Sequence, residues 1–290
     1  VDDGRFGFAH LVDASAAEKA VQQAVAIAKK SPSVSGFVLP SEQPAEDVSG
    51  RMDKHILDIG PEDLLEQADT VLSHVRSTDE RAVVTGGGVG VSATASCLMN
   101  SEGILSSGIT TSHGIGVQVS IDVDGQLTSS WQGQSGRSLL PAVPECVSRA
   151  VHWAQVTQNP LNVESSAVET PVLLTSEGFS PLFSMVVPPA MTGEKMVRKE
   201  SFWSESMGKE VLNPSLSLHD DGLLNGGMSS GSRDAEGVPR RRQTLVENGT
   251  LSNMLWSTRD AAQQVAEGRI EDAISTGSAS SGGHQSPPST

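Results

Sequence analysis

The sequence predicts an α+β protein of two domains, the first built from helices and antiparallel strands and the second rich in strands. Three observations lead to this prediction. Helical periodicity is confined to a few segments, alternating apolar residues fill the region between two of them, and short strand-like runs with Gly- and Asp-rich turns follow. We place the boundary near residues 160–169, which gives domains 1–160 and 161–290, and we expect the second domain to be sandwich- or barrel-like.

Three helices are expected in the first domain. The first covers 15–30, where Ser15 and Glu18 have the spacing of a capping box and alanines and valines form an apolar stripe. A second helix begins at Pro61, a residue favoured at the first helical position, and has leucines and valines on one face. The third runs over 144–158 and stops before the following Asn-Pro pair.

Between the second and third helices the apolar period changes to two, which is typical of strands. Residues 82–84 and 91–99 are predicted strands, and the glycine-rich stretch 86–90 is predicted to be a flexible hairpin connection. Neither a helix nor a Gly-Lys-Ser/Thr sequence follows these glycines, so a nucleotide-binding loop is not supported. Residues 115–123 alternate up to an Asp124-Gly125 turn, which predicts an antiparallel meander.

Charge and hydropathy exclude two classes of partner. With 20 Lys and Arg against 35 Asp and Glu among 290 residues, the formal net charge is −15. This charge would repel a phosphate backbone, so we expect no nucleic-acid binding. No run of about 18 apolar residues is present, so we expect no membrane span.

Two cysteines, Cys97 and Cys146, have no neighbouring Cys or His at ligand spacing. They form neither a disulfide framework nor a zinc ribbon, and a reducing, cytoplasmic location fits this usage. The chain begins without Met and ends in a Ser/Gly/Pro-rich tail, so we expect it to be a fragment of a longer protein.

Local catalytic motifs are absent from the sequence. No two of the seven histidines have the three- or four-residue spacing of metal ligands on a helix, and there is no Gly-x-Ser-x-Gly elbow. Imidazole and carboxylates cluster at His219-Asp220-Asp221. The two aspartates could bind a hard cation, but a turn in which they accept backbone N–H groups is the preferred interpretation.

Five specific motifs follow one another between residues 200 and 255. They are Ser201-Phe202-Trp203, Met207-Gly208-Lys209-Glu210-Val211, Leu216-Ser217-Leu218-His219-Asp220-Asp221-Gly222, Ser232-Arg233-Asp234-Ala235-Glu236-Gly237-Val238-Pro239 and Gln243-Thr244-Leu245-Val246-Glu247-Asn248-Gly249-Thr250-Leu251. This ordered series resembles the C-terminal domain of the TldD/TldE (PmbA) family. The resemblance implies that the signature turns of this domain bind ligand, through Asp220, Asp221, Asp234, Glu236, Gly237, Asn248 and Gly249.

The resemblance continues upstream. Asp3-Gly4-Arg5-Phe6-Gly7-Phe8-Ala9 is similar to the start of the family's N-terminal domain, and Leu98-Met99-Asn100-Ser101-Glu102-Gly103 is similar to one of its turns. Because the similarity covers essentially the whole chain, it implies that an N-terminal piece and much of the C-terminal domain are missing here.

Family members are of two kinds. In the TldD kind, a His-Glu-x-x-x-His helix at the start of the C-terminal domain supplies two metal ligands and a general base. The corresponding stretch here, residues 175–186, contains Glu177 but no histidine, and any family Cys ligand would lie beyond Thr290. The chain therefore resembles TldE, which implies no catalytic residue and no cofactor in this chain. Zinc is expected in a TldD-like partner that acts with it on a peptide substrate.

Two rival functions remain open at this point. One is a stand-alone metallopeptidase with a metal at His219, Asp220 and Asp221. The other is a regulator of DNA gyrase that acts by protein contact, which needs no metal.

Overall fold

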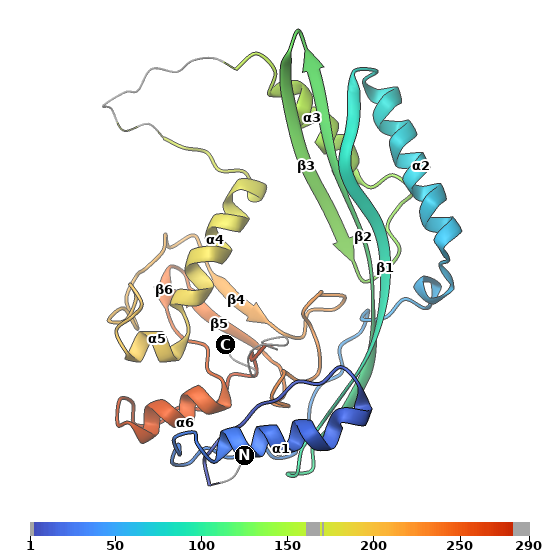
Figure 1. The fold of residues 1–290 in the computed structure, drawn as a ribbon. Helices are drawn as coiled ribbons and strands as arrows, with labels where there is room; N and C mark the ends of the chain where they lie inside the picture. The colour runs from blue at the N-terminus through green and yellow to red at the C-terminus, as the bar shows by residue number, and fades with distance from the viewer. Residues whose placement is uncertain (1–2, 161–168, 170, 281–290) are drawn as a thin grey trace.

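A computed structural model describes residues 3–160, 169 and 171–280 of the chain. Within this part, two three-stranded antiparallel sheets, with strand orders β1-β2-β3 and β4-β5-β6, pack with helices in the α+β arrangement predicted from the sequence (Figure 1). Neither sheet closes into a barrel. The helices are α1 (Ala17–Ala28), α2 (Pro61–Thr78), α3 (Glu145–Val156), α4 (Ser176–Ala190), α5 (Gly193–Val197) and α6 (Thr258–Ala266), and the strands are β1 (Ala82–Met99), β2 (Leu105–Val123), β3 (Gln126–Gly136), β4 (Leu218–Asp221), β5 (Arg242–Glu247) and β6 (Thr250–Leu251).

The first sheet is the predicted meander, but its first strand is longer than expected. β1 continues through the glycine-rich stretch 86–90 and pairs with β2 along almost its whole length, so the prediction of a hairpin connection there is wrong. Glycine permits an extended backbone as well as a turn, and here the register shifts between Val84 and Gly86, which marks a bulge rather than a reversal. The expected tight turn at Asp124-Gly125 is confirmed, with positive φ at both residues.

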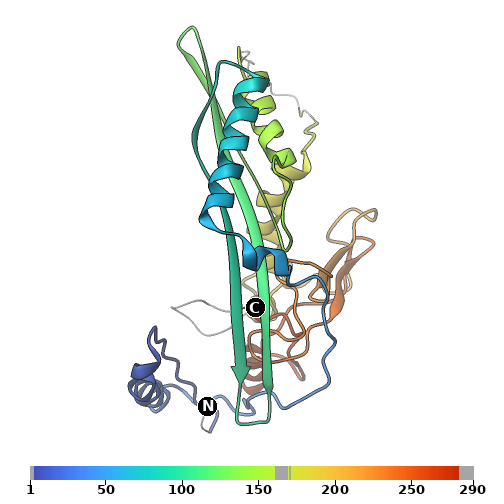
Figure 2. The same ribbon diagram turned by 90° about the vertical axis from the view of Figure 1, so that its right-hand side faces the viewer.

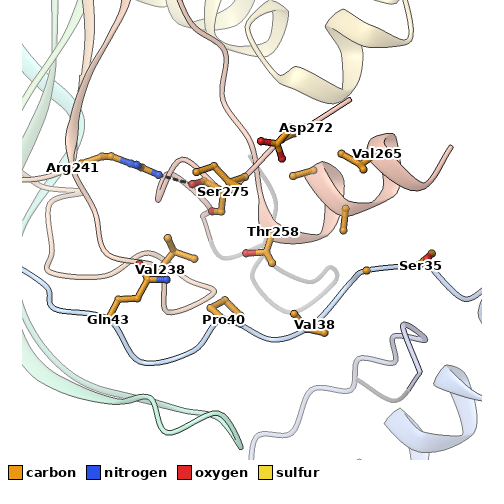
Figure 3. A pocket seen from close by; sticks show the side chains of 15 residues that line it. Ser35, Val38, Pro40, Gln43, Val238, Arg241, Thr258, Val265, Asp272 and Ser275 are labelled. Atoms are coloured by element: carbon orange, nitrogen blue, oxygen red, sulfur yellow. Dashed lines mark hydrogen bonds between the residues drawn. The ribbon is translucent and has the colours of Figure 1, made fainter. Parts of the chain in front are cut away.

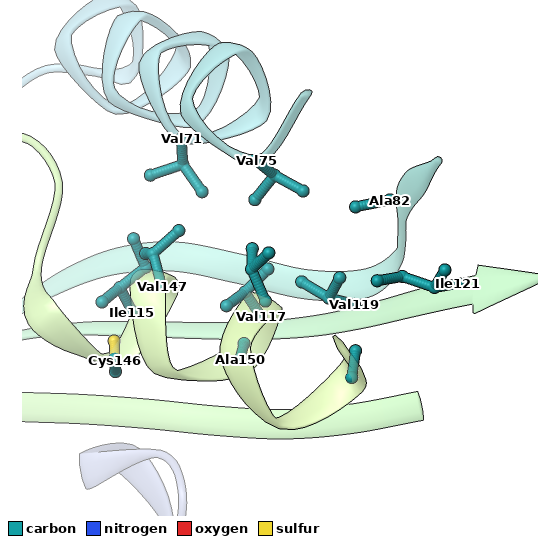
Figure 4. Close-up of a cluster of buried hydrophobic side chains, with 12 residues drawn as sticks. Val71, Val75, Ala82, Ile115, Val117, Val119, Ile121, Cys146, Val147 and Ala150 are labelled. Carbon is teal, nitrogen blue, oxygen red and sulfur yellow. The ribbon is translucent and has the colours of Figure 1, made fainter. Parts of the chain in front are cut away.

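The main apolar core lies between one face of this sheet and the helices α2 and α3 (Figure 4). Alternate residues of β2 point toward the helices, as the period of two predicts. Val75 of α2 and Val151 of α3 are fully buried there. The core consists of Val71, Val75, Ala82, Ile115, Val117, Val119, Ile121, Cys146, Val147, Ala150, Val151 and Ala154.

The distal half of the β1–β2 hairpin extends well past α2 and α3 (Figures 1 and 2). β3 pairs with β2 over its C-terminal part alone, from His113↔Gly136 to Val123↔Gln126. Residues 105–112 of β2 therefore lack a second strand partner within the described sheet. The predicted turn at residues 100–103 closes this arm, and its Asn100 N–H donates to the Ile104 carbonyl.

The first helix differs from the prediction in its cap and its burial. A 3₁₀ turn at Ala14–Ala16 precedes α1, and the Asp13 carboxylate accepts the Ser15 N–H, so the Ser15/Glu18 capping box does not form. Of the predicted apolar stripe, Ala20 is the one buried member, while Val21 is 62% exposed. Asp13 is simply the better-placed acceptor, because aspartate at an N-cap satisfies the first free N–H groups.

The second sheet has a separate core against α5. It consists of Met191, Met196, Trp203, Leu245, Val246 and Leu251. The predicted domain boundary at residues 160–169 falls largely outside the described residues, so that division stays a prediction. Among the described helices, none combines the length and apolar character that crossing a bilayer requires.

Candidate functional site

The signature residues of the second sheet gather at two opposite ends of β5. Asp220 and Asp221 pair with Gln243 and Arg242 at its start, whereas the Asn248-Gly249 turn follows its end. The structure therefore brings the aspartates near the loop over residues 231–240 but not near the Asn248-Gly249 turn.

The His219-Asp220-Asp221 cluster lies in strand β4 rather than in the expected turn. Alternation in the strand separates Asp220 from its two neighbours. His219 Nδ1 lies 3.1 Å from Thr244 Oγ1, and Asp220 Oδ2 accepts from Gln243 Nε2 at 3.1 Å and from Ser278 Oγ. Asp221 alone behaves as expected, since its Oδ1 accepts the Leu223 N–H at 3.1 Å.

The Asp234 carboxylate holds the loop 231–240 together. It is 5% exposed, its Oδ1 accepts the N–H groups of Glu236 and Val238 at 3.0 and 2.9 Å, and its Oδ2 accepts the Ala279 N–H at 3.1 Å. Burial raises the pKa of Asp234, and the three N–H donors oppose that rise by stabilising the charged form. All these partners are backbone groups, which makes Asp234 a loop organiser.

Glu236 links the same loop to the first turn of α6. Its Oε2 accepts the Thr258 N–H at 2.7 Å, an N–H group that the helix itself leaves unpaired. Burial raises the pKa of Glu236, and the donor at Thr258 opposes the rise. Gly237 follows with a φ of +94°, and a methyl group there would lie 2.9 Å from Ile104 Cδ1 of the hairpin turn. Glycine is therefore required where the loop meets the hairpin.

A cavity of about 420 Å³ lies beside this loop, between the N-terminal strap of residues 35–43, α6 and residues 272–275 (Figure 3). Arg241 crosses one wall, where Nε donates to the Thr276 carbonyl at 3.0 Å and Nη2 to the Ser275 carbonyl at 2.5 Å. Small apolar residues of α6 line the opposite wall. The arginine of this cavity is therefore already paired, and Asp272 contributes the one carboxylate of its lining.

Helix α4 occupies the stretch where the family resemblance predicts a metal helix. Its polar residues are engaged locally: Ser184 Oγ donates to the Ser180 carbonyl at 2.8 Å, and Glu177 forms an ion pair with Arg149 of α3 at 3.3 Å. The helix has no histidine. Throughout the described ranges, no three His, Cys, Asp or Glu side chains converge in a way that could hold a metal ion. A catalytic zinc therefore does not fit these residues.

Comparison with known proteins agrees with the motif series. The model of the PmbA/TldA metallopeptidase C-terminal domain matches residues 167–290. Metalloprotease PmbA of Escherichia coli O157:H7 is 27% identical over 263 residues, which cover 89% of this chain and 58% of that protein. Residues 167–290 thus match the C-terminal domain of this family, and the chain is similar to PmbA over most of its length.

Two further proteins are similar to almost the whole chain. An uncharacterized protein of Methanocaldococcus jannaschii is 27% identical over 284 residues, which cover 97% of this chain and 62% of that protein. The solved structure of TldE from Thermococcus kodakarensis has the same fold, with a TM-score of 0.82 and 23% identity over 99% of this chain and 64% of that one. The chain thus spans about three-fifths of the length of these relatives.

Sequence reasoning missed a group of arginines around the distal half of the hairpin. Another cavity is lined by Arg51, Arg233 and Arg240. Arg137 is close enough to Arg51 for the two positive charges to interact. Arg51 and Arg137 belong to no local motif, and both are far along the chain from Arg233, which lies in the signature series, and from Arg240. The sequence therefore carries no signal that could have grouped them.

Proposed function

We propose that this chain forms part of the non-metal subunit of a cytoplasmic, TldD/TldE-type metallopeptidase. In this proposal a metal-bearing homologue supplies the zinc and the general base, and the present chain helps to hold the peptide. The observation that carries it is helix α4, which lies at the family's metal-motif position yet has no histidine. The two cysteines are unpaired, as suits a reducing compartment.

Exposed apolar side chains on α4 support an association with another subunit. Leu182, Met185 and Val186 are each at least half exposed, and Met185 is 75% exposed. An apolar surface of this kind is typical of protein interfaces rather than of solvent-facing helices. We assign α4 to the contact with the metal-bearing homologue.

Strand β1 supplies a means of holding an extended peptide. It is 18 residues long, contains no charged residue, and pairs with β2 alone within the described sheet. Its outer edge therefore presents unpaired N–H and C=O groups along the strand. A peptide that adds to this edge as a further strand would be held by main-chain hydrogen bonds, which are independent of peptide sequence.

Peptidase assays of separated and mixed subunits test this proposal. We expect neither this protein nor its metal-bearing homologue to cleave unstructured peptides efficiently alone, and the mixture to be active. Met185→Asp should abolish the activity of the mixture, because a charge would be buried in the interface. Leu65→Asp, at a side chain of α2 that is 67% exposed, should not. Cleavage by this protein alone would contradict the proposal and favour a stand-alone peptidase.

The gyrase rival predicts a different result. A regulator acting by protein contact would bind purified DNA gyrase and change its supercoiling activity, and the mixture of subunits would cleave no peptide. A pull-down with gyrase beside the peptidase assay therefore separates the two functions.

A further inference from the structure

A cavity of about 420 Å³ separates the distal half of the β1–β2 hairpin from the loop 231–240. Its lining is rich in groups that donate hydrogen bonds to anions. Three arginines, Arg51, Arg233 and Arg240, contribute positive charge, and serines of both strands contribute hydroxyl groups. This composition stands out in a chain whose net charge is −15.

Arg51 is the unsatisfied member of this set. Its side chain is half-buried, its Nε is fully buried without an acceptor, and its guanidinium forms no hydrogen bond or ion pair with any other residue of the described part. A methyl group on Gly108 would lie 3.6 Å from Arg51 Nη1, and one on Gly231 would lie 3.7 Å from Cζ. Gly108 and Gly231 therefore flank the guanidinium closely, and a methyl group at either position would be in van der Waals contact with it.

A second guanidinium increases the positive potential at this point. Thr111, which is 1% exposed, donates its N–H to the Arg51 carbonyl at 3.1 Å and accepts from Arg137 Nη1 at 3.2 Å. Burial lowers the pKa of Arg137, and the positive charge of Arg51 lowers it further. The two arginines are therefore close enough to repel each other, and no carboxylate in the described part pairs with either.

The remaining charges of the lining do not neutralise Arg51. Arg233 Nη2 pairs with Glu42 at 2.7 Å and Arg240 Nε donates to the Arg233 carbonyl at 3.1 Å. The one carboxylate of the lining, Asp234, already accepts three N–H groups. Arg51 thus lacks a counter-charge within the described part of the chain, and an anion in the cavity would supply one.

We propose that this cavity binds an oxyanion, a carboxylate or a phosphate group, with Arg51 as its principal ligand and the serine hydroxyls as further donors. The planar guanidinium matches both groups, because two parallel N–H donors can reach two oxygens. The cavity is larger than one such group, so the anion is part of a larger molecule or is accompanied by water. This inference does not depend on the peptidase proposal.

Calorimetric titration of the purified protein tests this anion-binding proposal. Two probes are titrated separately: inorganic phosphate, and a short peptide with an acetylated N-terminus, an amidated C-terminus and two glutamates. We expect at least one probe to bind, and binding to weaken as NaCl increases. Arg51→Gln should weaken binding roughly ten-fold or more, whereas the matched variant Arg76→Gln, on the exposed face of α2, should leave it unchanged. The arm that binds more tightly identifies the source of the anion.

Arg51→Lys provides a second variant that keeps the charge but removes the planar fork. We expect it to bind with an affinity between those of wild type and Arg51→Gln. In the absence of any probe, Arg51→Gln should melt at the same temperature as wild type or higher, since it removes an unpaired charge. Failure of both probes to bind wild type at millimolar concentration, or equal binding by wild type and both Arg51 variants, would overturn the proposal.

Discussion

The Asp79 carboxylate connects three elements of the first domain. It follows α2, its two oxygens accept from the Arg81 side chain at 2.9 and 2.7 Å, and Oδ2 also accepts from Gln155 of α3 at 3.0 Å. The hydrogen bonds from Arg81 lower the pKa of Asp79 well below its usual range, and those from Gln155 lower it further. One side chain thus fixes how α2 leads into β1 and how α3 packs beside them.

We expect Asp79→Ala to lower the free energy of unfolding at pH 7 by about 1–3 kcal/mol, because the hydrogen bonds to a charged acceptor are lost while Arg81 stays half-exposed. Urea denaturation measures this change, with Asp69→Ala on the exposed face of α2 as the control.

The pH dependence of that difference has a defined sign. Because the pKa of Asp79 is lowered by folding, its contribution is fully present above the ordinary aspartate value of 3.8 and disappears as the pH falls through the folded pKa. The difference in free energy of unfolding between wild type and Asp79→Ala should therefore become smaller as the pH falls below about 4. A gap that is constant from pH 7 to pH 2 would show that packing, and not the charged acceptor, is responsible.

Within the elements, strand β1 depends on one particular glycine. Gly87 has a φ of +140°, and a methyl group there would lie 2.3 Å from the Gly116 carbonyl oxygen of β2. The neighbouring Gly88 has open space around it and lacks such a φ. The bulged part of the strand therefore needs glycine at position 87 and not at position 88.

Gly87→Ala should lower the free energy of unfolding by about 1–3 kcal/mol, because it imposes both a strained backbone and a clash on the β1–β2 pair. Gly88→Ala should be neutral or stabilise by up to about 1 kcal/mol through a smaller unfolded-state entropy. Thermal denaturation of the two variants makes the comparison, and equal effects would contradict the strand register described for this region.

These elements also show what the sequence can and cannot predict. The alternation in β2 is confirmed, since burial on one side imposes a period that the sequence displays. The predicted apolar face of α2 is confirmed at Val71 and Val75, whereas Leu65 of the same face is 67% exposed. The continuation of β1 through its glycines was missed, because glycine is compatible with a strand, a bulge or a turn and β2 decides between them. The cavity around Arg51 was missed for a related reason: its lining comes from separate parts of the chain that only tertiary contacts bring together.

At the scale of the whole molecule, the negative net charge opposes binding to nucleic acids. A charge of −15 gives little release of counterions from DNA, and the arginines around Arg51 lie in a cavity rather than in a basic stripe along the surface. We expect no binding to duplex DNA at physiological salt. A gel-shift assay that found submicromolar affinity, falling steeply with added salt, would contradict this expectation.

The central claim is that the catalytic zinc and base belong to the partner and that this chain contributes none of the reacting groups. It is tested most directly by mixing this protein with a metal-bearing homologue in which the glutamate of the His-Glu-x-x-x-His motif is replaced by glutamine, and measuring peptide hydrolysis. The account predicts that this mixture is inactive, while the unmodified homologue gives an active one and this protein still associates with both. Sustained peptide cleavage in the mixture with the altered homologue would contradict it, because the catalytic group would then lie in the present chain.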